Sequence, residues 1–179
     1  MNYYRSIVKR KVLLHICCVP CSTSAVKTLC CEYNISFYWY NPNIYDTQEY
    51  NNRKDAAIKY SKELNVFFYE ETAFVYNYDD WKNKTLEKCS LCYTLRLAKT
   101  AAFVMQNQFD SFSTSLLSSP YQQHDLIKQQ IANNFAGRYM LEFVYKDFRI
   151  DFYDAKNSLK QKGYYIQKYC GCHKSYREI

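Results

Sequence analysis

Seven of the nine cysteines fall into three short clusters, and thiols at such close spacings suit metal binding or redox chemistry. The clusters are Cys17-Cys18-Val19-Pro20-Cys21, Cys89-Ser90-Leu91-Cys92 and Cys170-Gly171-Cys172. We find no signal-peptide pattern, so we expect a reducing, cytoplasmic compartment in which structural disulfides are rare. The sequence therefore predicts one metal and redox site to which all three clusters contribute.

The first two clusters each contain a pair of cysteines separated by two residues, which lets both sulfurs of a pair reach one metal centre. The pairs lie about 70 residues apart, much further than in a zinc ribbon, so the fold must bring them together. Cys17 adds a thiol beyond those that a closed four-cysteine zinc site needs, which favours an iron–sulfur cluster over zinc. A thioredoxin-like dithiol at Cys18 and Cys21 is an alternative, but it leaves Cys89 and Cys92 unexplained.

The third cluster places two thiols one residue apart, and a disulfide across so short a spacing is strained and easily reduced. Gly171 permits the backbone conformation that such a ring needs. We interpret Cys170 and Cys172 as a redox-active dithiol. Two further metal ligands, or exposed cysteines in a tail, are the alternatives.

The remaining cysteines, Cys30 and Cys31, have no companion motif, and we expect them to be small buried residues of a helix. His15 lies on an apolar strand and is expected to be a hydrogen-bonded core histidine. The three glycines are isolated, so the sequence contains no glycine-rich phosphate loop.

Strand-like and helix-like segments alternate along the chain, which predicts an α/β fold. We expect a mostly parallel sheet of about five strands with helices on both faces, Rossmann-like and similar to HUP/PP-loop folds. The predicted strands are 11–17, 35–40, 66–69, 109–117 and 140–145. The predicted helices are 22–33, 47–65, 89–108, 121–135 and 151–161, with a loop at 70–84.

Polar or cysteine-containing segments follow four of these strands. They are residues 17–21, 41–43, 118–122 and 146–149. Because ligands of parallel sheets bind beyond the carboxyl ends of the strands, we expect the metal site at this edge.

Length and charge suggest one domain over residues 1–179, with a basic lead at 1–11 and a basic tail at 163–179 that carries Cys-Gly-Cys. The net charge is +7, and tyrosines are interleaved with lysines in the tail. This combination suits nucleic acid, although a solubilising tail is the alternative. No apolar run is long enough to span a membrane, and we expect no membrane partner.

With these motifs in place, the sequence resembles the QueH family of epoxyqueuosine reductases over nearly its whole length. The similar segments are LHICCVPC at 14–21, YNPNI at 40–44, EYNNR at 49–53, CSLCYTLRL at 89–97, TSLLSSPYQ at 114–122, YKDFR at 145–149 and YCGC at 169–172.

The resemblance implies reductive deoxygenation of the epoxide of epoxyqueuosine, at the wobble position of a tRNA anticodon stem-loop, to give queuosine. It implies a [4Fe-4S] cluster whose ligands are Cys17, Cys18, Cys89 and Cys92. It also implies a redox-active disulfide between Cys170 and Cys172, and an electron-donor protein or other reductant as a further partner. Cys21 stands where an additional iron would be held beside the cluster, and its role is open.

Several residues near the predicted edge are hypotheses for substrate binding. They are Asn41, Arg53, Tyr93, Arg96, Tyr121, Gln122 and Arg149. The alternatives are a solvated helix face for the arginines at 53 and 96 and core packing for the two tyrosines. For the whole chain, the alternatives are a zinc-stabilised RNA-binding module, a thiol-disulfide oxidoreductase and an iron–sulfur tRNA thiolation enzyme.

Overall fold

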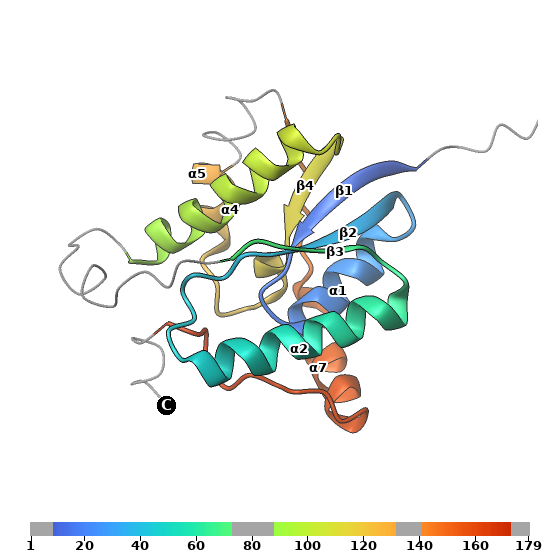
Figure 1. The fold of residues 1–179 in the computed structure, drawn as a ribbon, viewed down its shortest axis with the longest axis vertical. Helices are drawn as coiled ribbons and strands as arrows, with labels where there is room; N and C mark the ends of the chain where they lie inside the picture. Colours follow the sequence, from blue (N-terminus) through green and yellow to red (C-terminus); the bar gives the residue numbers. More distant parts are fainter. Residues whose placement is uncertain (1–8, 73–87, 132–140, 173–179) are drawn as a thin grey trace, which may run out of the picture.

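The computed structural model describes residues 9–72, 88–131 and 141–172, which fold around a five-stranded sheet (Figure 1). The strands are β1 (Arg10–His15), β2 (Tyr33–Trp39), β3 (Phe68–Glu70), β4 (Ser111–Thr114) and β5 (Glu142–Phe143). Their order in the sheet is β3-β2-β1-β4-β5, and every neighbouring pair is parallel. The predicted parallel sheet of five strands is confirmed.

The central strand β1 is apolar because both of its faces are covered. Val12, Leu13 and Leu14 are fully buried, as is Phe112 on the neighbouring strand β4. Strands buried on both faces are typical of parallel sheets, and each buried Leu contributes about 1.5–3 kcal/mol. These residues form the core that holds the carboxyl ends of β1 and β4 side by side.

Helices cover both faces of the sheet, as predicted (Figure 1). On one face lie α1 (Val19–Leu29), α2 (Thr47–Leu64) and α7 (Phe152–Gln161). On the other face lie α4 (Lys88–Gln106) and α5 (His124–Ile131). None of the helices in these residue ranges has both the length and the apolar character that a membrane crossing requires.

Local capping explains where two of the helices begin and end. Helix α1 begins three residues before the predicted start because Pro20 is tolerated in a first turn, where its missing N–H is not needed. Helix α2 begins after Asp46, whose carboxylate accepts the Glu49 N–H at 2.6 Å. It ends at Asn65, which adopts a left-handed conformation with φ 53°.

The strand predicted over 109–117 is only partly correct. Strand β4 stops at Thr114, and the 3₁₀ turn η1 (Ser115–Ser118) follows. The Thr114 side chain accepts the Leu116 N–H at 3.2 Å, which turns the chain out of the sheet. A second 3₁₀ turn, η3 (Arg149–Asp151), precedes α7, and most of the predicted loop 70–84 lies outside the described residues.

The expectation that Cys30 and Cys31 are buried is wrong. Both side chains are exposed. Helix α1 ends at Leu29, four residues before the predicted end, so the two cysteines fall in the turn that leads to β2. They lie outside the helix face that packs on the sheet.

Candidate metal and redox centre

The first cysteine cluster lies where the strand order reverses. Strands β1 and β4 are neighbours in the sheet but not in the chain, and their register pairs His15 with Thr114 at the carboxyl end. Just beyond, the Cys17 N–H donates to Ser115 Oγ at 3.1 Å. This is the switch point of an open parallel sheet, where such folds bind their ligands.

The thiols of Cys17, Cys18 and Cys21 all lie within 4.8 Å of one another. Cys18 caps α1 in an extended conformation, and Cys21 follows one turn later on the same buried side. Phe152 of α7 closes the cluster from the apolar side. Three sulfurs at this separation form a donor set that a metal centre can use.

Burial and mutual hydrogen bonding separate the pKa values of these thiols. Hydrogen bonds from the Cys18 and Cys21 thiols, with help from Arg96 and Ser115, hold the Cys17 pKa well below its usual value. Burial raises the pKa of Cys18, and the contacts with Cys17 and Cys18 raise that of Cys21. Cys17 is therefore the first thiolate of the cluster, and thiolates are the metal-binding form.

The second cluster lies in the first turn of α4, where the Cys92 side chain is buried and that of Cys89 is exposed. Arg96, one turn further along the helix, places Nη1 3.7 Å from Cys92 Sγ. Burial raises the Cys92 pKa, and the positive charge of Arg96 opposes this shift.

Arg96 is the central cation of the site. It is 1% exposed, donates through Nη2 to Asn41 Oδ1 at 2.6 Å, and places Nε 3.4 Å from His15 Nε2. No carboxylate in residues 9–72, 88–131 or 141–172 forms an ion pair with it. A buried guanidinium without a counter-ion is costly, so its surroundings favour ionised thiols.

Thiols from all three clusters act on Arg96. Burial lowers its pKa, but the charges of Cys92, Cys17 and Cys170 outweigh this effect and raise it overall. Side-chain and backbone contacts connect the clusters around this charge: Arg96 reaches Cys92 Sγ directly and the first cluster through Asn41, and Gln122 joins Tyr93 of the same helix to Cys170 Sγ.

His15 and Asn41 connect the ends of the central strands to this charge. The ring nitrogens of His15 lie 3.0 Å from Thr114 Oγ1 and 3.2 Å from the Tyr40 carbonyl oxygen. Burial lowers the His15 pKa to about 3, so the ring is neutral. Asn41 donates to the Ile16 carbonyl at 2.9 Å. The expectation of a hydrogen-bonded core histidine is confirmed.

The third cluster lies beside the second. Gln122 Nε2 lies 3.8 Å from Cys170 Sγ, and its amide oxygen accepts the Tyr93 hydroxyl at 2.8 Å. The contact with Cys172, together with burial, raises the Cys170 pKa well above its usual value. Cys170 and Cys172 are both in the thiol form in this structure.

The other predicted binding residues divide into buried and exposed groups. Arg53 is 3% exposed and contacts the backbone of the C-terminal segment, so a solvated helix face is wrong for both Arg53 and Arg96. Tyr93 packs in the core, whereas Tyr121 is 76% exposed, which excludes core packing for it. Arg149 is at the surface and donates from Nε to Asp147 at 2.8 Å.

Tyr121 lies near the first cluster through an aromatic contact. Its ring packs edge-on against Phe152, with the centroids 6.4 Å apart, and Phe152 contacts Cys18 and Cys21. An exposed ring therefore stands one residue away from the candidate metal site.

Sequence reasoning missed three residues that contact the site. Ser115 Oγ lies 3.4 Å from Cys17 Sγ, Gln167 Nε2 approaches Cys18 Sγ, and Glu49 forms an ion pair with Arg53. Ser115 lies inside the strand predicted over 109–117, and it reaches the edge only because β4 ends earlier, at Thr114. Gln167 carries no local signal, because Cys18 lies 149 residues away. Glu49 does carry one, since it stands four residues before Arg53 on a predicted helix, and this spacing indicates an ion pair.

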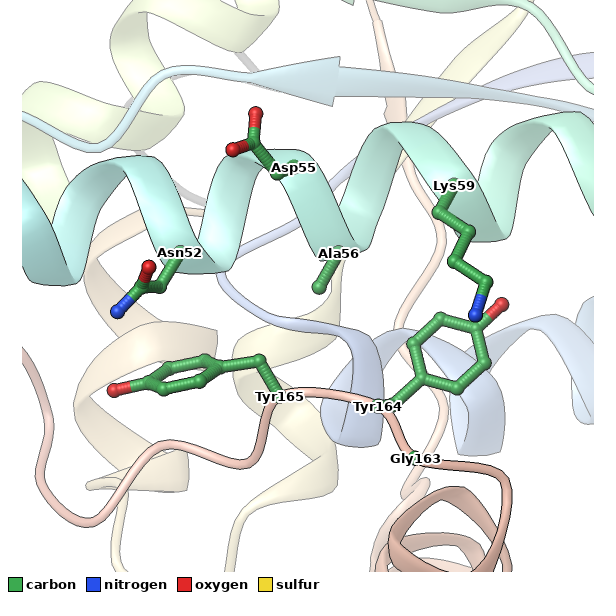
Figure 2. A pocket seen from close by; sticks show the side chains of 7 residues that line it. All are labelled: Asn52, Asp55, Ala56, Lys59, Gly163, Tyr164 and Tyr165. Atoms are coloured by element: carbon green, nitrogen blue, oxygen red, sulfur yellow. The ribbon is translucent and has the colours of Figure 1, made fainter.

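A separate surface pocket lies between α2 and residues 163–165 (Figure 2). It is lined by α2 side chains, including Asn52 and Lys59, and by Tyr164 and Tyr165. No cysteine lines it. This pocket is therefore not part of the cysteine site.

Comparison with known proteins gives a consistent result. Residues 12–178 match the family model described as "Epoxyqueuosine reductase QueH". A protein of that name from Dehalococcoides mccartyi is 33% identical, with 90% of each chain covered. Another from Thermotoga maritima is 31% identical, over 90% of this chain and 88% of the relative.

Proposed function

This chain belongs to the epoxyqueuosine reductase QueH family, a family of oxidoreductases that act on tRNA, and we propose how its three cysteine clusters carry out the reduction. The reaction converts the epoxide of epoxyqueuosine at the wobble position to the alkene of queuosine. The observation that supports our proposal is a chain of contacts that links the three clusters. Arg96 contacts Cys92 Sγ and Asn41, and Asn41 binds the Ile16 carbonyl next to Cys17. Tyr93, beside Cys92, binds Gln122, which contacts Cys170 Sγ.

The residues at the edge of the sheet fit an iron–sulfur centre. The donors are thiols, a neutral His15 is already engaged, and Arg96, which pairs with no carboxylate among the described residues, supplies a positive charge for an anionic metal–thiolate group. We propose that Cys17, Cys18, Cys89 and Cys92 hold a [4Fe-4S] cluster and that Cys21 holds an additional iron. Such a centre supplies one-electron transfer and a Lewis acid for the epoxide oxygen.

Cys170 and Cys172 are proposed to supply the reducing equivalents. Loss of the epoxide oxygen as water consumes two electrons and two protons. When two thiols form one disulfide, they release two electrons and two protons, so one dithiol balances one turnover. A thiol or protein reductant then returns the disulfide to the dithiol.

The substrate residues take different roles in this proposal. The wobble base lies in an unpaired loop, so it can be splayed out and stacked on an exposed ring such as Tyr121. Arg149 would contact a phosphate at the same rim. Tyr93 and Gln122 line the side of the site next to Cys170. Asn41, Arg53 and Arg96 are buried and support the site from the protein interior through their hydrogen bonds.

The proposal is tested with an anticodon stem-loop RNA that carries epoxyqueuosine, under anaerobic conditions and with an excess of reductant. We expect the wild-type protein to remove one oxygen atom from the nucleoside, as measured by mass spectrometry. Cys170→Ser and Cys172→Ser should abolish turnover, whereas Cys30→Ser, on the exposed turn, should retain it. Full turnover by Cys170→Ser would contradict the proposed role of the dithiol.

A further inference from the structure

Glu49 and Arg53 form a buried ion pair one helical turn apart on α2. Their exposed fractions are 8% and 3%, and Arg53 Nε lies 2.6 Å from Glu49 Oε1. Buried ion pairs contribute little net stability, so the pair needs another explanation.

The remaining nitrogens of Arg53 bind the backbone next to the third cysteine cluster. Nη1 donates to the Cys170 carbonyl at 3.0 Å, and Nη2 donates to the Tyr169 carbonyl at 2.8 Å. Glu49 neutralises the charge, and the planar guanidinium fixes two consecutive carbonyls at once. The contact therefore determines where the main chain of Cys170 lies.

Neighbouring residues attach the same segment to α2. The Tyr165 hydroxyl donates to Glu49, and the Tyr169 ring lies over Arg53, with 5.4 Å between Cζ and the ring centroid. Figure 2 shows the preceding residues, Tyr164 and Tyr165, lying along α2. The segment is thus held along one side of the helix up to Cys170.

Gly171 permits the closest approach. Its φ is +113°, and a Cβ at this position would lie 2.9 Å from Ile44 Cγ1 and 3.3 Å from Arg53 Nη1. The Gly171 carbonyl accepts the Tyr45 N–H at 3.3 Å. A glycine between the two cysteines therefore lets the segment lie directly on the Arg53–Glu49 pair.

We propose that Arg53 and Glu49 are positioning residues that hold Cys170 and Cys172 at the metal and redox centre. This inference rests on the proposed redox role of the two cysteines. Arg53 acts through the carbonyls of Tyr169 and Cys170, and Glu49 acts through Arg53 and the Tyr165 hydroxyl. Arg53 thereby positions the segment that carries Cys170 and Cys172.

The test measures the thiols directly, without substrate. In Arg53→Met we expect alkylation of Cys170 and Cys172 to accelerate about tenfold, as hydrogen bonds to a buried charge are lost, while Cys18 and Cys21 stay protected. The ratio of dithiol to disulfide at Cys170 and Cys172, measured in a glutathione redox buffer, should also differ between Arg53→Met and the wild type. Arg53→Lys should not restore wild-type behaviour, because an ammonium group cannot bind both carbonyls. The adjacent Lys54→Met, which removes a partly exposed ion pair with Glu70, is the matched control.

Equal reactivity of Cys170 in Arg53→Met and Lys54→Met would overturn the inference. An equal rise at all cysteines would indicate general loss of the fold in Arg53→Met, and the decision then rests on Gly171→Ala, in which unchanged Cys170 reactivity would overturn the inference. Gly171→Ala displaces the same segment without removing the ion pair, and it should also expose Cys170 if Arg53→Met does not fold. Because the readout needs no turnover, its failure is distinct from a failure to reduce epoxyqueuosine.

Discussion

The guanidinium of Arg96 lies 3.7 Å from the sulfur of Cys92, and in the described part of the chain it has no carboxylate partner. Its other contacts, Asn41 and His15, are neutral. The buried charge of Arg96 therefore favours ionised thiols in the site, and Cys17 is the first of these. An anionic metal–thiolate centre would balance this charge.

We predict that Arg96→Met makes the reduction potential of the centre more negative and lowers its iron content. Removing the nearby positive charge destabilises the more negative, reduced form. A spectroscopic redox titration measures the potential. Lys99→Met, on the same helix with an exposed ion pair to Glu71, is the control. An unchanged potential at full iron loading would show that Arg96 does not act on the centre.

The Asn41→Asp variant tests the effect of the Arg96 charge on the reduction potential while Arg96 itself is kept. Asn41 Oδ1 lies 2.6 Å from Arg96 Nη2, so a carboxylate at this position would neutralise the guanidinium. We expect the potential to shift in the same negative direction as in Arg96→Met, with Arg96 still present. A positive shift in the same titration would refute the electrostatic interpretation.

Cys17→Ser should lose most of its bound iron, whereas Cys30→Ser should bind as much as the wild type. Cys17 has the lowered pKa of a thiolate and lies at the switch point, while Cys30 is exposed in a turn. Metal analysis of the purified variants measures the difference. Comparable iron in both variants would remove Cys17 from the ligand set.

Tyr121→Ala should weaken binding of the anticodon stem-loop by about 1–3 kcal/mol, or roughly 5- to 150-fold, if its ring stacks on a base. Tyr121→Phe keeps the ring and should bind normally. Phe67→Ala removes a ring of similar exposure, 74% against 76%, next to the edge strand β3 and serves as the control. Fluorescence anisotropy with labelled RNA measures the binding affinity of each variant. An equal loss of affinity in Phe67→Ala and Tyr121→Ala would argue against a specific stacking site at Tyr121.

Local patterns were sufficient to predict the sheet and the edge that carries the site. Apolar runs such as Val12 to Leu14 predict buried parallel strands, and the topology then places residues 17–21 and 115–118 side by side. The two-residue spacing of Cys18 and Cys21 was enough to predict the first cluster, although α1 begins three residues earlier than predicted and so contains Cys21.

Contacts between distant residues were not predictable in the same way. Arg53 binds carbonyls 116 and 117 residues away, and no periodicity in α2 reveals that its polar residues face another segment. The exposure of Cys30 depends on the end of α1, and helix ends are poorly determined by composition. Tertiary packing decides both features.

The most direct test of the account is the iron, zinc and acid-labile sulfide content per chain after anaerobic purification, recorded with the visible spectrum. We predict about four irons with matching sulfide and a broad visible absorption, as expected for a cysteine-bound [4Fe-4S] cluster. Iron in excess of sulfide would support an additional ion at Cys21. Zinc without sulfide or colour would contradict the account.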